Sequence, residues 1–179
     1  MSTSIRNTIE TQYNVCKQNL MIVILGSYEP PENKQRLIEF KNSLIAAGYA
    51  KATLVEDYPD DLIPGLLTST PERIYVKSMH LCQISHCNFV VATHDGAGIG
   101  WVNELTYCCR NCPNGVVKTT VFDEQRDSQS ALGIVNLGMV SLHNMAYEHF
   151  SNIDELKSAG ERTAFRYLIR LLDKLVQSQ

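Results

Sequence analysis

Three short runs along the chain have the composition of strands: the first is apolar at every position, the second is apolar at its centre, and the third is rich in β-forming residues. They are residues 20–25, 88–93 and 116–122, and Gly26 and Ser27 close the first of them. Successive side chains of a strand point to opposite faces, so a continuous apolar run is typical of a strand buried on both faces. The pattern therefore predicts the central strands of a parallel sheet that helices cover on both sides.

Helical periodicity occupies the segments between and after these runs. Apolar residues spaced three and four positions apart predict five helices, at residues 32–48, 70–86, 101–110, 128–137 and 152–175. Residues 52–55 and 146–150 are two further strand candidates. Residues 57–70 are rich in Pro, Gly and Asp, which indicates an irregular segment with one helical turn, and residues 112–115 have the composition of a turn.

The alternation of strand and helix, repeated about five times, defines the expected architecture. It predicts a three-layer α/β sandwich with about five mostly parallel strands. Residues 20–179 contain no linker or repeat, and we expect them to form a single domain. Residues 1–19 have little apolar periodicity and are predicted to be a helical or frayed N-terminal arm.

Composition narrows the classes of function. The 179 residues carry 16 basic and 19 acidic side chains, a formal charge of -3. Without a basic excess there is little to replace counterions on a phosphate backbone, so we expect no nucleic-acid partner. The apolar runs are far shorter than the roughly 20 residues of a membrane span, and the N-terminus is polar. We expect a cytoplasmic protein with no membrane partner.

Six cysteines are spread through the chain, and reduced, partly buried thiols are the expected state. One alternative is a structural zinc site, for which Cys109 and Cys112 form a C-x-x-C pair with Cys82 and Cys87 as further ligands. The five histidines form no pair at the spacing of a catalytic metal site, so no catalytic metal is expected.

The candidate functional residues are those that follow the predicted strands, because ligands of open α/β sheets bind outside the carboxyl ends of the strands. Three segments should meet there: residues 26–29, Asp57 with Tyr58, and residues 93–104. The third contains glycines at positions 96, 98 and 100 and leads into a helix whose first N–H groups are free to bind an anion. It follows a middle strand, whereas the dinucleotide-binding fingerprint follows the first strand, which argues against an NAD-binding Rossmann site.

Glu104 lies one turn into the helix that this loop opens, and Asp95 lies in the loop. A carboxylate at that position can act as a nucleophile or stabilise a cationic centre in a partly dry cleft. A partner of the helix dipole or a surface glutamate is the alternative interpretation. Trp101 can stack on a bound base or pack the helix start against the sheet.

The residues Gly26-Ser27 and Gly100-Trp101-Val102-Asn103-Glu104 resemble the nucleoside 2-deoxyribosyltransferase superfamily, which includes the deoxynucleoside 5′-monophosphate N-glycosidases. The resemblance covers residues 20–122. It implies a flavodoxin/Rossmann-like fold, no cofactor and a homo-oligomer. The chain departs from the family pattern at Gly98, where Asp is common, and at Thr106 and Asn88.

By this resemblance, Glu104 is the nucleophile that attacks the anomeric carbon of a nucleoside or nucleotide, through an oxocarbenium-like transition state. Asp95 would orient a sugar hydroxyl or protonate the leaving base. Tyr28 would position the nucleophile or stack on the base. The residues expected to bind the substrate are Gly26, Ser27, Gly98, Gly100 and Trp101.

Two alternatives stay open at this stage. The same order of elements suits a nucleotide-binding or sensing module without catalysis. It also suits the NAD hydrolases of the TIR type, which use a helical glutamate against a ribosyl centre. Glu104 separates catalysis from binding, because its replacement should abolish base release in an enzyme and leave ligand affinity intact in a binding module.

Overall fold

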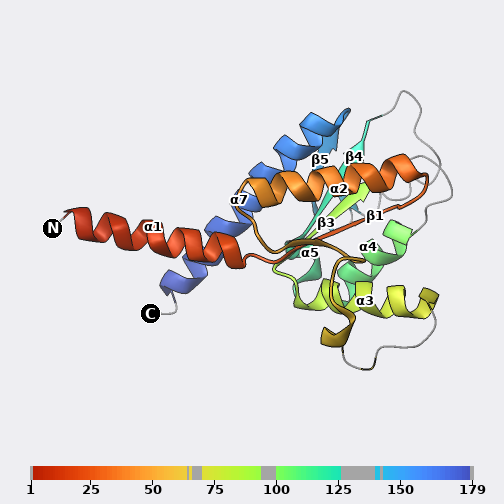
Figure 1. Ribbon diagram of the computed structural model, residues 1–179, viewed down its shortest axis with the longest axis horizontal. Helices are drawn as coiled ribbons and strands as arrows, with labels where there is room; N and C mark the ends of the chain where they lie inside the picture. The colour runs from red at the N-terminus through yellow and green to blue at the C-terminus, as the bar shows by residue number, and fades with distance from the viewer. Residues whose placement is uncertain are drawn as a thin grey trace.

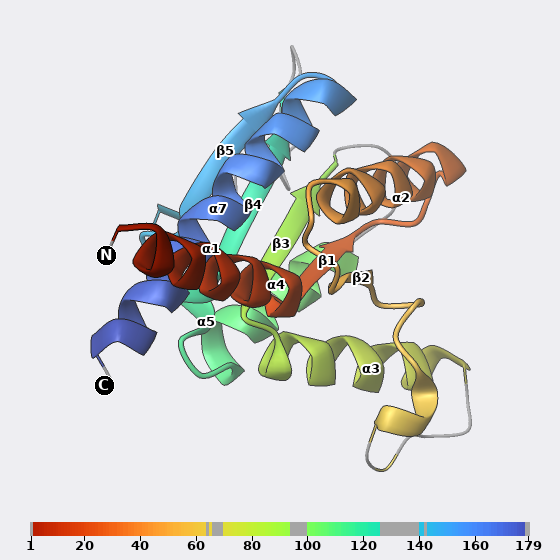
Figure 2. The ribbon, with the colours of Figure 1, turned by 60° about the vertical axis from the view of Figure 1, so that its left-hand side comes forward.

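Five parallel strands form one sheet in the computed structural model, which describes residues 2–63, 65, 70–93, 100–125, 140–141 and 143–177. The strands are β1 (Ile22–Gly26), β2 (Ala52–Leu54), β3 (Cys87–Ala92), β4 (Thr119–Glu124) and β5 (Ala146–Phe150). Their order across the sheet is β2-β1-β3-β4-β5, which Figure 2 shows from one edge to the other. The predicted three-layer α/β sandwich with a parallel, flavodoxin-like sheet is confirmed.

The strand register places the carboxyl ends of the central strands side by side. Gly26 at the end of β1 is paired with Val91 of β3, and Ala92 of β3 is paired with Asp123 of β4. The chain moves from β1 outward to β2 and then returns past β1 to β3. The order of the strands therefore reverses between β1 and β3, and this is the position at which such sheets bind ligands.

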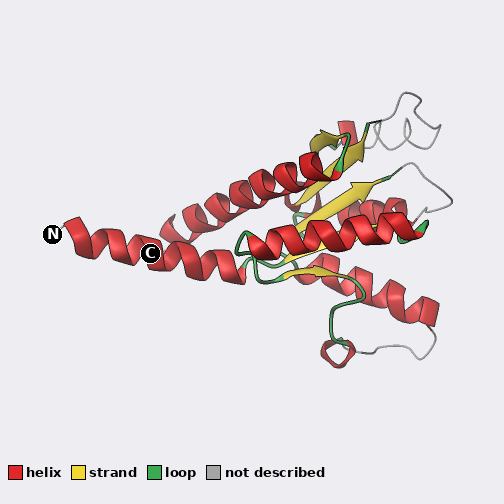
Figure 3. Ribbon diagram, turned by 45° about the horizontal axis from the view of Figure 1, so that its top comes forward, coloured by secondary structure: helices red, strands yellow, loops and turns green. Residues whose placement is uncertain are grey.

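Helices cover both faces of the sheet (Figures 1 and 3). The helices are α1 (Ser2–Asn19), α2 (Pro31–Ala46), the 3₁₀ turn η1 (Asp60–Leu62), α3 (Thr70–Ile84), α4 (Gly100–Asn111), α5 (Gly115–Lys118) and α7 (Ile153–Gln177). α2 and α7 lie on one face, and α3 and α4 lie on the other. The predicted N-terminal arm is the helix α1, which extends away from the sheet beside the end of α7.

Alternate side chains of each central strand pack into two separate hydrophobic cores, one on each face of the sheet. Ile22 and Ile24 of β1 pack under α2 and α7, whereas Val23 and Leu25 pack under α3 and α4. This division follows from the two-residue period of a strand. In the first core the rings of Phe40, Phe89 and Phe122 form a cluster with centroids 5.1 to 6.2 Å apart.

The ends of two helices follow the sequence signals. α2 ends before Gly48, where the N–H of Gly48 bonds to the carbonyl of Ile45 and the N–H of Tyr49 bonds to the carbonyl of Leu44. α7 begins after Asn152, whose side-chain oxygen accepts the N–H of Glu155 at 3.0 Å.

One predicted strand starts too early. Residues 116–122 were expected to be a strand, but residues 115–118 form the short helix α5 and β4 begins at Thr119. A Cβ at Gly115 would overlap the carbonyl oxygen of Cys108, so this glycine lets the turn pack directly against the end of α4. The predicted helix at residues 128–137 lies outside the described residues. In the described ranges no helix has the length and apolar character needed to cross a bilayer.

Gly160 allows α7 to approach α2, because a Cβ there would overlap the ring of Phe40. We expect Gly160→Ala to lower the free energy of unfolding by about 1–2 kcal/mol in urea titrations. Overpacking of a core costs about 1–3 kcal/mol, and the better helix propensity of Ala returns up to about 1 kcal/mol. Ser158→Ala, at an exposed position of the same helix, is the control. Equal stability of the two variants would contradict the packing described here.

Candidate functional site

The candidate site lies at the carboxyl edge of the sheet, where the strand order reverses between β1 and β3. Ser27 and Tyr28 follow β1, Thr93 follows β3, and the first turns of α4 face them from the α3 side of the sheet. The loop that joins β3 to α4 contains Asp95 and Gly98, and these two predicted site residues lie outside the described residues. Gly100, a third predicted site residue, is the first residue of α4.

Glu104 is the buried acid of this site. Its Oε1 accepts a hydrogen bond of 2.7 Å from the hydroxyl of Ser78 on α3. The residue as a whole is half-buried, but Oε2 has no contact with solvent and no hydrogen-bond partner among the described residues. Burial raises the pKa of the Glu104 carboxyl to about 7, and the hydrogen bond from Ser78 lowers it. Glu104 is therefore partly protonated at neutral pH.

Tyr28 lies close enough to Glu104 for the charge of the carboxylate to act on the phenol. Burial, then the charges of Glu56 and Glu104, raise the pKa of Tyr28 well above its usual value of 10.0. Tyr28 is consequently a neutral phenol at all physiological pH values. The ammonium of Lys34 lies 5.8 Å from the centroid of its ring and pairs with Glu56 at 2.9 Å. The side chain of Tyr28 packs against the core under α2 and α7. A shared pocket for Tyr28 and Glu104 stays a prediction.

Gly26 and Ser27 shape the turn after β1. A Cβ at Gly26 would lie 3.0 Å from Leu37 and 3.2 Å from the carbonyl of Val91, so α2 and β3 fill the space around it. The hydroxyl of Ser27 donates to the carbonyl of Glu29 at 2.7 Å and accepts the N–H of the same residue at 3.2 Å. Gly26 and Ser27 therefore hold the backbone that carries Tyr28. Contact of these two residues with a substrate stays a prediction.

Trp101 lies in the apolar core under α3 and α4, where only 4% of its surface is exposed. Its neighbours in that core include Val90, Ala92 and Leu105. This position corresponds to the packing interpretation of Trp101. A contact between the indole and a bound base stays a prediction.

Two hydroxyl groups at the site were not singled out from the sequence. Ser78 lies on the buried side of α3, at helical spacing from Leu81, Cys82 and Ser85, so a serine within an apolar stripe was the available signal. Thr93 is buried directly after β3, and its Oγ1 has no hydrogen-bond partner within the described part of the chain. Thr93 and Glu104 thus each have a buried oxygen with no hydrogen-bond partner in the described ranges.

A second acid, Asp123, lies further along the same edge. It is buried at the end of β4, accepts the hydroxyl of Tyr147 at 2.6 Å, and lies 3.8 Å from Nδ1 of His149 on β5. Asp123 was not among the predicted site residues, because the predicted strand ended one residue earlier, at Phe122. The polar residue after a run of apolar strand residues was the available signal.

The six cysteines are free thiols. Burial raises the pKa of Cys87 above its usual range and that of Cys109 to about 11, so neither thiol is a nucleophile at neutral pH. Across the ranges that the structure describes, no group of three or more His, Cys, Asp or Glu side chains is placed to hold a metal ion. The geometry of these residues does not support the zinc alternative.

Comparison with known proteins adds no assignment. No protein-family model matches the chain, and no curated protein matches it. The arguments about function therefore depend on the strand order and on the side chains at the carboxyl edge.

The raised pKa of Glu104 has a consequence for stability. The folded state holds the proton up to a pH of about 7, whereas an unfolded glutamate releases it near 4.5, so ionisation destabilises the fold as the pH rises between these values. We expect Glu104→Gln, which keeps an acceptor for Ser78, to be more stable than the wild type by up to about 3 kcal/mol at pH 8. At pH 4.5 the two proteins should differ little.

Urea unfolding at both pH values measures this difference. Glu161→Gln is a matched control because Glu161 is exposed on α7, and it should show no comparable dependence on pH. A Glu104→Gln variant that is less stable than the wild type at pH 8 would contradict the burial of an ionisable carboxyl.

Proposed function

We propose that the chain is an enzyme that cleaves the N-glycosidic bond of a nucleoside or nucleotide, as a hydrolase or a deoxyribosyltransferase, with Glu104 as the nucleophile. The observation that carries the proposal is the Glu104 carboxyl, which is buried, has one oxygen without a partner among the described residues, and has a pKa raised to about 7. The proposal agrees with the resemblance to the nucleoside 2-deoxyribosyltransferase superfamily and with ligand binding where the strand order reverses.

The chemistry of the anomeric carbon explains why such a carboxylate is useful. As the bond between C1′ and the base nitrogen breaks, its electron pair leaves with the base and positive charge develops on the sugar. Oε1 of Glu104 is held by Ser78, so Oε2 is the oxygen free to bond to C1′. Water or an acceptor base then attacks C1′, the ester bond to Glu104 breaks, and the attacking group gives its proton to the Asp95 carboxylate that protonated the leaving base. A carboxylate with a pKa near 7 is more basic than an ordinary one, and is therefore the stronger nucleophile.

Three further side chains are assigned supporting roles in this proposal. The neutral phenol of Tyr28 donates a hydrogen bond that positions the nucleophile or a sugar hydroxyl, and the free hydroxyl of Thr93 takes a second sugar contact. Asp95 is proposed to supply the proton that the leaving base requires. The base nitrogen then departs neutral, and the proton balance of the step is complete.

Replacement of the proposed nucleophile, Glu104, tests the proposed reaction directly. We expect Glu104→Gln to reduce base release from a deoxynucleoside 5′-monophosphate by about a thousandfold or more, since the amide cannot form the glycosyl ester. In the wild type, kcat/KM should rise as the pH increases through about 7, because only the ionised carboxylate attacks. Chromatographic detection of the free base measures both effects, and Glu161→Gln should retain full activity.

A panel of substrates separates the alternatives. Base release confined to NAD would replace the deoxyribosyl substrate with the TIR-type reaction. Binding of a nucleotide without turnover by the wild type, and with equal affinity in Glu104→Gln, would contradict catalysis and favour a sensing module.

We also propose a homo-oligomer, since exposed apolar side chains occur on two helices. Phe165, Ile169 and Val176 lie on one side of α7 at helical spacing and are 47%, 38% and 73% exposed, and Ile9 and Val15 of α1 are also exposed. α1 extends from the sheet beside α7, where a second chain has access to both (Figure 1).

Sedimentation velocity at micromolar concentration tests the assembly. We expect a species of at least twice the 20.1 kDa of one chain, because burying these side chains removes apolar surface from water. Phe165→Glu should shift the protein toward the monomer, and a wild type that sediments as a monomer would contradict the proposal.

A further inference from the structure

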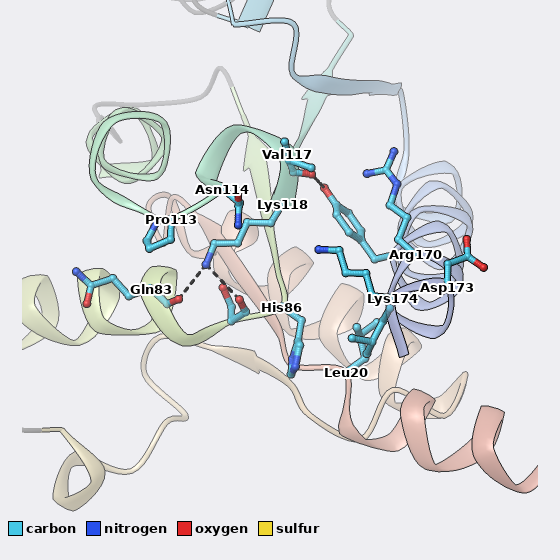
Figure 4. Close-up of a pocket in the computed structure, with 13 residues that line it drawn as sticks. Leu20, Gln83, His86, Pro113, Asn114, Val117, Lys118, Arg170, Asp173 and Lys174 are labelled. Carbon is cyan, nitrogen blue, oxygen red and sulfur yellow. Dashed lines mark hydrogen bonds between the residues drawn. The ribbon is translucent and has the colours of Figure 1, made fainter. Parts of the chain in front are cut away.

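A second concave site lies at the amino edge of the sheet, opposite the proposed nucleophile. It encloses about 510 Å³, which is within the range of small-molecule sites. The end of α1, the turn before β3, the α4–α5 turn, α5 and the last turns of α7 form its walls (Figure 4). Since the proposed reaction takes place at the carboxyl edge, this pocket has no part in it.

The pocket concentrates positive charge on a chain whose net charge is -3. Lys118, Arg170 and Lys174 line it, and the acid among its lining residues, Asp173, points away from the space (Figure 4). Lys174 extends from α7 toward Lys118 in the same view. None of these three cations pairs with a carboxylate of the described residues.

Neutral groups hold the innermost cation in place. The ammonium of Lys118 donates to the carbonyls of Gln83 at 2.9 Å and Ser85 at 3.1 Å, which orient it without cancelling its charge. Nδ1 of His86 accepts the N–H of Met21 at 2.9 Å, so the neutral imidazole carries its proton on Nε2. The polar lining is therefore rich in donors, and a ligand with several acceptor oxygens matches it.

The remaining lining is apolar. Leu20, Pro113, Val117 and Leu171 contribute carbon surface between these polar groups. An inorganic anion would leave this surface unused, whereas an anion with an apolar or aromatic body would cover it.

From this combination we infer that the pocket binds an organic phosphate monoester, with its dianion between Lys118 and Lys174 and its apolar body against Leu20, Pro113 and Leu171. The guanidinium of Arg170 lies over the ring of Tyr167, 5.6 Å from its centroid, at the side of the pocket. The two formal charges of the phosphate match the two ammonium groups of Lys118 and Lys174. The site would take such a ligand independently of base release at the opposite edge.

Calorimetric titration with phenyl phosphate tests the inference, with inorganic phosphate and phenol as probes of each half of the ligand. We expect saturable binding of phenyl phosphate that is tighter than that of either half. Lys174→Gln should weaken it about tenfold, the effect of losing one charge-assisted hydrogen bond. Lys157→Gln, which removes the same charge at the other end of α7, should leave the affinity unchanged.

The same variants separate this site from the proposed active site. Glu104→Gln should bind phenyl phosphate like the wild type, and Lys174→Gln should release base at the wild-type rate. The inference is overturned if phenyl phosphate shows no saturable binding, if Lys174→Gln binds it as tightly as the wild type, or if Glu104→Gln abolishes the binding.

Discussion

The central strands are buried on both faces, and this constraint determines where polar chemistry is possible in the molecule. Every residue of β3, and all but the last residues of β1 and β4, are buried beneath helices. Neither face of these three central strands is open to a ligand, so their functional groups are confined to the two edges where strands meet loops and helix ends. The reversal of strand order between β1 and β3 then selects one position on the carboxyl edge.

The two edges have opposite electrostatic character. The carboxyl edge holds the buried acids Glu104 and Asp123, each bonded to a hydroxyl group. The amino edge holds the cations Lys118 and Lys174 without acidic partners in the described ranges. Burying an ionisable carboxyl opposes stability, and such groups are common where catalysis needs a perturbed pKa. The position of Glu104 is therefore better explained by chemistry than by folding.

The sequence was sufficient to predict the sheet, because apolar runs and the geometry of parallel strands are local properties. A pocket shared by Tyr28 and Glu104 stays a prediction. The contact between Glu104 and Ser78 depends on how α3 packs against α4, which no local pattern contains. The early start predicted for β4 has a similar cause. Val116 and Val117 favour a strand by composition, but packing against Cys108 holds residues 115–118 in a helical turn.

The ionisation of Glu104 inside the fold is the property on which the proposed chemistry depends most directly. Carbon-13 NMR of protein labelled at the glutamate carboxyl carbons, with Glu104→Gln used to assign the signal, follows this group through a pH titration. Burial beside Ser78 predicts a midpoint of about 7. A midpoint near 4.5, the ordinary value for glutamate, would show that the carboxylate is solvated and would contradict the proposed role of Glu104 as a buried nucleophile.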